Sequence, residues 1–246
     1  MLTLLPPSPA FVIHSREYHE HSLLIEFFTL NHGRVAAIAK RVKTVRSSFK
    51  YLLQPFFPLK VSFKQGKSDL WQVYDVEPSG ELISFAVPEI FCASYLNELL
   101  YYLYKSKDSD PKLFASYLET LKSISEKISL DKALREFEFA LLDSLGYGIR
   151  FEDKDGNALQ SGCFYHFLPD SGFIKVSDCK SVSESVEFSE VFSSEKLIML
   201  LNKQYLSVDV LKCAQKITNK ALSTLLNNKE IKSRAYYRAF LQSKDK

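Results

Sequence analysis

The chain has 246 residues, 46% of them hydrophobic and 25% charged, which is the composition of an ordinary globular protein long enough to bury a core. Its four cysteines are widely spaced and include no CxxC pair, which argues against a secreted disulfide framework and against a four-cysteine zinc site. The net charge of +3 hides a partition, because residues 1–80 carry +4, residues 81–202 carry −8 and residues 203–246 carry +7.

We expect a cytoplasmic protein with reduced thiols. The first ten residues contain three prolines and no basic side chain, unlike a signal peptide. No apolar run approaches the roughly 20 residues that a membrane-spanning helix needs. The thiols in question are Cys92, Cys163, Cys179 and Cys213.

Five short apolar runs predict β strands in the first 80 residues. They are rich in Val, Ile, Phe and Leu and are separated by turn signals at residues 31–33 and 65–68. The predicted strands are Ala10–Ser15, Ser22–Thr29, Arg34–Ala39, Leu59–Phe63 and Leu70–Val76. Five strands in so short a span indicate a small closed barrel, and the OB-fold is the commonest five-stranded barrel that binds nucleic acid.

A helical period replaces this alternation from Val87-Pro88, where proline suits the first turn of a helix. The further predicted helices are residues 112–128, 130–145, a segment from about 194, 208–226 and 233–241. Residues 150–192 lose the pattern but keep two short apolar runs, Phe164–Leu168 and Phe173–Val176. The predicted fold class is α+β: an OB-fold nucleic-acid-binding domain at residues 1–80, and a mainly α-helical domain at residues 81–246 with an irregular insertion at about 150–192.

The segment between Glu26 and Asp69 is one-sided in charge. Its 42 residues contain nine basic side chains and no acidic one. Solvated surfaces normally mix both signs, so this acid-free segment, residues 27–68, is a candidate surface for a polyanion. Residues 40–50 predict a basic loop, which suits gripping a phosphate backbone. The candidate DNA-binding residues here are Arg34, Lys40, Arg41, Lys43, Arg46 and Lys50.

A charge run is more commonly just a solvated face, but three features argue against that interpretation here, and the first is that the run contains no acidic residue. The run lies inside a predicted barrel, and aromatic side chains are interleaved with it, as in grooves that hold single strands. These aromatics are Phe49, Tyr51, Phe56, Phe57, Trp71 and Tyr74; most should fill the barrel interior, and none is assigned to stacking. A second basic cluster, Lys232, Arg234 and Arg238, either extends the same surface or is a solvated helix end.

No motif argues for catalysis. Gly66-Lys67-Ser68 ends like a phosphate-binding loop, but Val61 stands where that loop needs a glycine, so a hairpin turn is the better interpretation. His19 and His21 would share one face of a strand, yet no third metal ligand has a defined position. Gly146-Tyr147-Gly148 follows a helix and lacks a third glycine, which indicates a helix terminator.

Several strings, taken in order, resemble the bacterial RecO recombination and DNA-repair proteins. The resemblance runs from about residue 10 to about residue 240. The strings are His32-Gly33-Arg34, Ala39-Lys40-Arg41, Leu53-Gln54-Pro55-Phe56, Tyr95-Leu96-Asn97-Glu98-Leu99-Leu100, Phe137-Glu138, Leu141-Leu142, Leu145-Gly146-Tyr147-Gly148 and Lys232-Ser233-Arg234.

The resemblance implies an N-terminal OB-fold, a helical C-terminal domain and a non-enzymatic role in RecF-pathway repair. It further implies binding of single- and double-stranded DNA, annealing of complementary strands and help in recombinase loading, in association with the nucleoid. The expected partners are RecR and the acidic C-terminal tail of single-stranded DNA-binding protein. Many members carry a four-cysteine zinc module after the Gly-Tyr motif, but only Cys163 and Cys179 occur in that region, so no zinc is expected.

Two other functions stay open from the sequence. One is a protein–protein adaptor whose helical domain is the main functional surface. The other is a nuclease, which would need a metal-binding carboxylate cluster that the sequence does not reveal.

Overall fold

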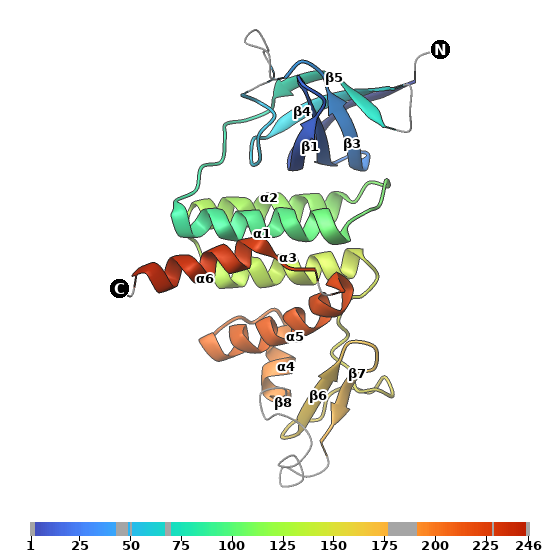
Figure 1. The fold of residues 1–246 in the computed structure, drawn as a ribbon. Helices are drawn as coiled ribbons and strands as arrows, with labels where there is room; N and C mark the ends of the chain where they lie inside the picture. The colour runs from blue at the N-terminus through green and yellow to red at the C-terminus, as the bar shows by residue number, and fades with distance from the viewer. Residues whose placement is uncertain are drawn as a thin grey trace. The chain divides into compact units, whose positions relative to one another are not determined.

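The computed structural model describes residues 3–42, 49, 51–66, 70–176, 191–227 and 229–244, without the side chain of Lys244. The chain forms two compact units. The barrel unit is Met1–Ser129 with Glu230–Lys246, and the helical unit is Leu130–Lys229. The chain therefore returns to the barrel unit with its last helix (Figure 1). The predicted domain boundary at residue 80 stays a prediction.

Five strands close into a barrel at the start of the chain. They are β1 (Leu4–Tyr18), β2 (Ser22–Thr29), β3 (Gly33–Ala39), β4 (Leu59–Gln65) and β5 (Trp71–Pro78). The strand order is β1-β2-β3-β5-β4, with β4 pairing back onto β1. Only β3 and β5 run parallel among these pairs; the others are antiparallel. The predicted five-stranded OB-fold barrel is confirmed.

The barrel interior is filled by alternate residues of its strands. Ile25 and Phe27 of β2 and Val61 and Phe63 of β4 are fully buried in one apolar cluster. The rings of Phe27 and Phe63 meet edge to face, with centroids 5.3 Å apart. This alternation follows from the two-residue period of a strand, which sends every second side chain inward.

The outer faces of β1 and β2 are buried as well, under helices α1 (Val87–Leu103) and α2 (Pro111–Ser125). Phe11 and Phe28 point outward from the barrel but are at most 2% exposed. Their ring centroids lie 5.2 and 5.7 Å from that of Tyr117 on α2. Phe28 also contacts Phe114 and Tyr104. Barrel and helices thus share a second aromatic core.

Local signals set the helix starts. Asp110 caps α2, since its carboxylate accepts a 2.9 Å hydrogen bond from the backbone N–H of Leu113. The last helix, α6 (Lys232–Lys244), packs on α1. Glu98 of α1 accepts hydrogen bonds from the N–H groups of Lys232 and Ser233, at 2.7 and 2.9 Å. A carboxylate here satisfies two donors of the α6 N-terminus and fixes the returning chain.

The helical unit contains α3 (Leu130–Ser144), α4 (Ser194–Leu201) and α5 (Val208–Leu226). Between α3 and α4 lies a sheet of β6 (Phe164–Leu168), β7 (Gly172–Lys175) and β8 (Val191–Ser193), in the order β7-β6-β8. The predicted irregular insertion therefore contains regular structure, and its two apolar runs are β6 and β7. Strands this short carry too few alternations to be recognised from periodicity.

A buried polar cluster joins α3 to α5. The Arg135 guanidinium donates to Glu138 at 2.7 Å, and both side chains are almost fully buried. The Thr218 hydroxyl donates to the other carboxylate oxygen of Glu138. A buried charge is tolerated only when it is paired and hydrogen-bonded, which explains why these three groups occur together.

The six predicted helical segments are all present within the described residues, with ends shifted by a few residues. The α+β class, a barrel followed by a mainly helical region, is confirmed. No helix in the described part of the chain has the length and apolar character that crossing a bilayer requires.

We predict that Phe28→Ala destabilises the protein by about 3–5 kcal/mol, because it opens a cavity between the barrel and α2. Urea unfolding followed by circular dichroism measures this loss. Leu206→Ala is the control, since Leu206 is 78% exposed and its loss should change stability by less than about 0.5 kcal/mol. Equal effects of the two substitutions would contradict the shared aromatic core.

Candidate nucleic-acid interface

Two of the predicted DNA-binding residues lie at the end of β3. Lys40 and Arg41 follow the last residue of β3 in a turn, and both side chains are exposed. Arg41 has a positive φ of 56°, and the next residue, Val42, is 2% exposed within the barrel core. Val42 therefore anchors the turn from inside while the two cations face solvent. Lys43, Arg46 and Lys50 lie outside the described residues.

Strand pairing brings this turn next to β4 and β5. Ala37 and Ile38 of β3 pair with Trp71 and Gln72 of β5, and Gln72 pairs in turn with Lys64 of β4. Neighbouring strands lie about 5 Å apart, so the end of β3, the start of β5 and the end of β4 form one edge of the barrel. Cations from two separate parts of the acid-free segment meet there.

Lys64 lies near the end of β4 and belongs to this edge, whereas Lys60 lies at the other end of the same strand. Their neighbours Val61 and Phe63 are fully buried, so the alternation turns both lysines outward. Lys60 lies opposite Glu77 of β5. The sequence places both lysines in the acid-free segment, but they were absent from the predicted DNA-binding set. In the sequence, both lysines alternate with apolar residues at the predicted β4 strand. This alternation was the signal that they lie on the outer face of the barrel.

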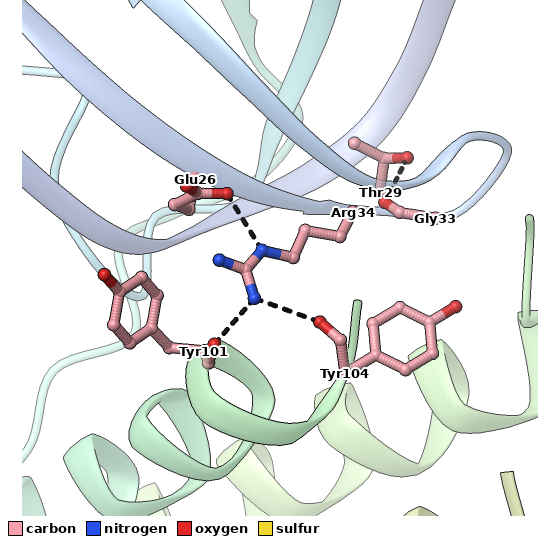
Figure 2. A network of polar contacts seen from close by, with 6 residues as sticks. All are labelled: Glu26, Thr29, Gly33, Arg34, Tyr101 and Tyr104. Carbon is pink, nitrogen blue, oxygen red and sulfur yellow. Dashed lines mark hydrogen bonds and ion pairs between the residues drawn. The ribbon is translucent and has the colours of Figure 1, made fainter. Parts of the chain in front are cut away.

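Arg34 occupies a different place and has a different set of contacts (Figure 2). Its Nε donates to Glu26 at 2.9 Å, and Nη1 donates to the carbonyls of Tyr101 and Tyr104 at 2.6 and 3.1 Å. Its guanidinium carbon lies 5.0 Å from the Tyr101 ring centroid, and the side chain is 15% exposed. We call these four residues the Arg34 network.

The Arg34 network connects the β2–β3 hairpin to the C-terminal end of α1. A guanidinium suits this position because it satisfies carbonyls that have no partner within the helix and complements the negative end of the helix dipole. Arg34 therefore has a structural role that its place in a basic run did not reveal, and its predicted contact with DNA stays a prediction. In the sequence, Glu26 and Arg34 lie eight residues apart on adjacent predicted strands, and this spacing was the signal that an acidic side chain lies close to Arg34.

The turn before Arg34 fits closely against the chain after α1. The Thr29 hydroxyl donates to the Gly33 carbonyl at 2.8 Å, and the Arg34 N–H donates to the Ser106 carbonyl at 2.9 Å (Figure 2 shows the first of these). Gly33 has a φ of +59°, and a Cβ there would lie 2.4 Å from the backbone oxygen of Asp108. Only glycine allows this approach.

Tyrosine and histidine side chains complete the contact with α1. The Tyr104 hydroxyl donates to the Asp108 carbonyl at 3.0 Å, and burial raises the pKa of Tyr104 to about 12. The His14 ring lies 4.1 Å from that of Tyr101, and burial lowers the pKa of His14 below its usual value. Both groups are therefore uncharged at neutral pH, as a packed contact requires.

The C-terminal basic cluster lies on α6. Lys232 and Arg238 are exposed. Arg234 is half-buried, with its guanidinium 4.6 Å from the centroid of the Tyr95 ring and hydrogen-bonded to the Tyr95 hydroxyl at 2.5 Å. Arg234 therefore helps to fasten α6 to α1, while the other two present charge to solvent. Whether they contact DNA stays a prediction.

The described residues contain no group of three or more His, Cys, Asp or Glu side chains placed to hold a metal ion. His19 and His21 lie in the turn between β1 and β2 rather than on a strand, and the His19 ring packs on Tyr18. Cys163 and Cys213 are thiols, and burial raises the pKa of Cys213 to about 12. Cys179 lies outside the described residues, so the absence of zinc stays a prediction.

Gly66 follows β4 and precedes β5, its antiparallel partner. The connection therefore joins the two strands of a hairpin, as the missing glycine at Val61 indicated. Lys67, Ser68 and Asp69 lie outside the described residues.

The helical unit has a cavity of about 630 Å³ between the sheet and α5. Its lining is of mixed charge, with Arg150 and Lys154 beside Asp153 and Asp170. A lining with both signs selects no single class of ligand.

Two family models match the chain. The model described as "Recombination protein O N terminal" matches residues 7–81, and "Recombination protein O C terminal" matches residues 88–235. This chain belongs to the RecO family. Similar RecO proteins, each named "DNA repair protein RecO", occur in Tolumonas auensis, with 35% identity covering 95% of both chains, and in Coxiella burnetii, with 36% identity covering 92% of this chain and 95% of the relative. That of Methylococcus capsulatus is 32% identical over 94% of this chain and 92% of its own.

The family assignment confirms the resemblance and makes this a DNA repair protein of the RecO family. The two matched regions meet between β5 and α1, where the barrel strands end and the helices begin.

We predict that Gly33→Ala destabilises the protein more than Gly146→Ala. Both glycines have a positive φ, but a Cβ at Gly146 meets no atom within 4 Å, whereas one at Gly33 meets backbone. Gly146→Ala should cost about 1 kcal/mol from φ alone, and Gly33→Ala about 1–3 kcal/mol more from the clash. Chemical unfolding of the two variants checks the difference; equal losses would refute the close approach.

We also predict that Arg34→Ala lowers stability by roughly 2–4 kcal/mol, because it leaves Glu26 and two helix carbonyls without their partner. Arg34→Lys should recover only part of this loss, since an ammonium cannot reproduce the forked geometry. Thermal melts of both variants measure the effect. Full recovery by lysine would mean that charge alone, and not the geometry of the network, matters.

Proposed function

We propose that this protein is a non-enzymatic DNA-binding recombination mediator. In this proposal it binds single- and double-stranded DNA, anneals complementary strands and assists recombinase loading during repair. Membership of the RecO family supports the setting, and the exposed Lys40 and Arg41 at the end of β3 support the contact. The observation that carries the proposal is their position on a barrel edge inside a segment with no acidic residue.

The mechanism we propose is electrostatic. Lys40, Arg41, Lys43 and Arg46 neutralise backbone phosphates and release counterions, so binding depends little on base sequence. A surface that screens two like-charged strands also lowers the free-energy cost of bringing them together. Annealing then needs no chemical step and no metal ion.

The proposed partners beyond DNA are RecR and the acidic C-terminal tail of single-stranded DNA-binding protein. An acidic tail would be attracted to basic helices, and residues 203–246 carry a net charge of +7. Zinc has no place in this proposal.

The second candidate, an adaptor that works through its helices, is favoured by exposed apolar residues near the α4–α5 connection. Leu201, Leu206 and Val208 are 56%, 78% and 66% exposed. Large exposed apolar side chains that occur together are typical of protein–protein contacts. The two functions are compatible, because these residues lie in the helical unit and the basic edge lies in the barrel unit.

We predict that the combined change of Lys40, Arg41, Lys43 and Arg46 to Ala weakens DNA binding and flattens its salt dependence. If about four phosphates are neutralised on a single strand, the slope of log affinity against log salt is near −3, from about 0.7 per phosphate. In the variant, these four contacts should contribute almost nothing to the slope. Fluorescence anisotropy of a labelled single strand over a salt series measures both quantities.

The matched control removes four positive charges elsewhere, from the exposed lysines Lys105, Lys107, Lys112 and Lys132. This control should keep nearly the full slope, because these lysines lie outside the acid-free segment. If both variants lose the same affinity and slope, only net charge matters and the assigned edge is wrong.

A further inference from the structure

The aromatic side chains interleaved with the acid-free segment separate by exposure. Phe56 is 7% exposed, and Phe49, Phe57 and Trp71 pack against the barrel core. Their rings fill the barrel and its ends. Tyr51 and Tyr74 differ, with 74% and 57% of their surfaces exposed.

Tyr74 lies on the outer face of β5, and neighbouring residues of the strand are buried in the barrel core. Val73 and Val76 are buried in the core, and Tyr74 faces solvent between them. The Lys64 ammonium of β4 lies 5.3 Å from the centroid of the Tyr74 ring. A cation at this distance is attracted to the ring, so the pair holds an aromatic surface and a positive charge side by side.

The position of Tyr74 continues the basic edge. Ile38 of β3 lies opposite Gln72 of β5 in a parallel pair, and Tyr74 follows Gln72 by two residues, at the point where β4 and β5 shift register. The turn with Lys40 and Arg41 follows this short β3–β5 pairing on one side, and the Lys64–Tyr74 pair lies beside it on the other. Ring and cations belong to one surface.

Two large aromatic rings on the outer faces of β1 and β2 are not accessible to a ligand. The outward aromatics of β1 and β2, Phe11 and Phe28, are buried against α1 and α2. The outer face of β4 and β5 is the part of the described barrel where an aromatic ring stays exposed beside a lysine.

Two acidic residues of β5 help to decide which lysine of β4 binds a phosphate. Asp75 and Glu77 are exposed on β5, and Glu77 lies opposite Lys60. The Asp75 carboxylate accepts a 3.0 Å hydrogen bond from the Val76 N–H. Since Lys60 faces a carboxylate across the strands, Lys64, opposite the uncharged Gln72, is the better phosphate ligand.

We propose that Tyr74 stacks on a base of bound single-stranded nucleic acid and that Lys64 neutralises the adjoining phosphate. Every base has a flat π face, so this contact adds affinity without base specificity, in keeping with an annealing protein. The inference rests on the proposed function and deepens it, because it assigns the residue that tells a single strand, with unstacked bases, from a duplex. The competing explanation is a cross-strand pair that only stabilises the hairpin.

The test is the affinity of the full-length protein for a labelled oligothymidylate and for an abasic strand of the same length. The wild-type chain should bind the abasic strand more weakly. Tyr74→Ala should weaken oligothymidylate binding by roughly 5- to 100-fold and remove the difference between the two strands, while Tyr74→Phe stays near the wild type. Lys64→Ala should reduce the salt slope by about 0.7.

Tyr147→Ala is the matched control, since Tyr147 is 58% exposed in the helical unit and should leave affinity unchanged. Wild-type preference for the normal strand, lost in Tyr74→Ala and kept in Tyr74→Phe, supports stacking. Salt-dependent wild-type binding with no preference, or with equal affinity in Tyr74→Ala, overturns stacking but leaves the proposed function standing. Absence of salt-dependent wild-type binding overturns the proposed function and the inference with it. Because the abasic comparison uses the wild-type chain, a lack of preference overturns stacking even if a variant fails to fold.

Discussion

The structure depends on the burial of both faces of β1 and β2. Ile25 and Phe27 fill the barrel, while Phe11 and Phe28 on the opposite face pack against Tyr117 of α2. A small barrel buries little apolar surface by itself. The second aromatic core, between the barrel and the helices, adds to the buried apolar surface. The Arg34 network then fixes the β2–β3 hairpin to the end of α1. These contacts bury one side of the barrel, whereas the end of β3 and the β4–β5 face stay accessible to a ligand.

Basic residues of the acid-free segment therefore have two different roles. Arg34 donates hydrogen bonds to two carbonyls at the end of α1 and to a carboxylate, whereas Lys40 and Arg41 are exposed beyond the last residue of β3. The difference lies in burial, because a guanidinium in a packed contact needs fixed acceptors, whereas an exposed cation is accessible to a phosphate. The proposed DNA contact accordingly uses the exposed cations.

Much of the fold could be predicted from the sequence, because alternation and helical spacing are local signals. The five barrel strands and the six helical segments lie where apolar residues recur with period 2 or 3.6, and Pro88 marked the start of α1. The small sheet at β6–β8 escaped, since its strands are short. The role of Arg34 also escaped, because its acceptors Tyr101 and Tyr104 are about 70 residues away and only folding brings them together. Lys64 and Tyr74 were visible as residue types, but their pairing needed the β4–β5 register.

We propose that the end of β3 and the β4–β5 face form the DNA-binding surface. Amide hydrogen exchange of the full-length protein, with and without a saturating single strand, tests it most directly. We expect new protection at residues 38–42 and along β4 and β5, with α3 and α5 unchanged. Protection confined to the helical unit or to α6, with the barrel unchanged, would contradict the account.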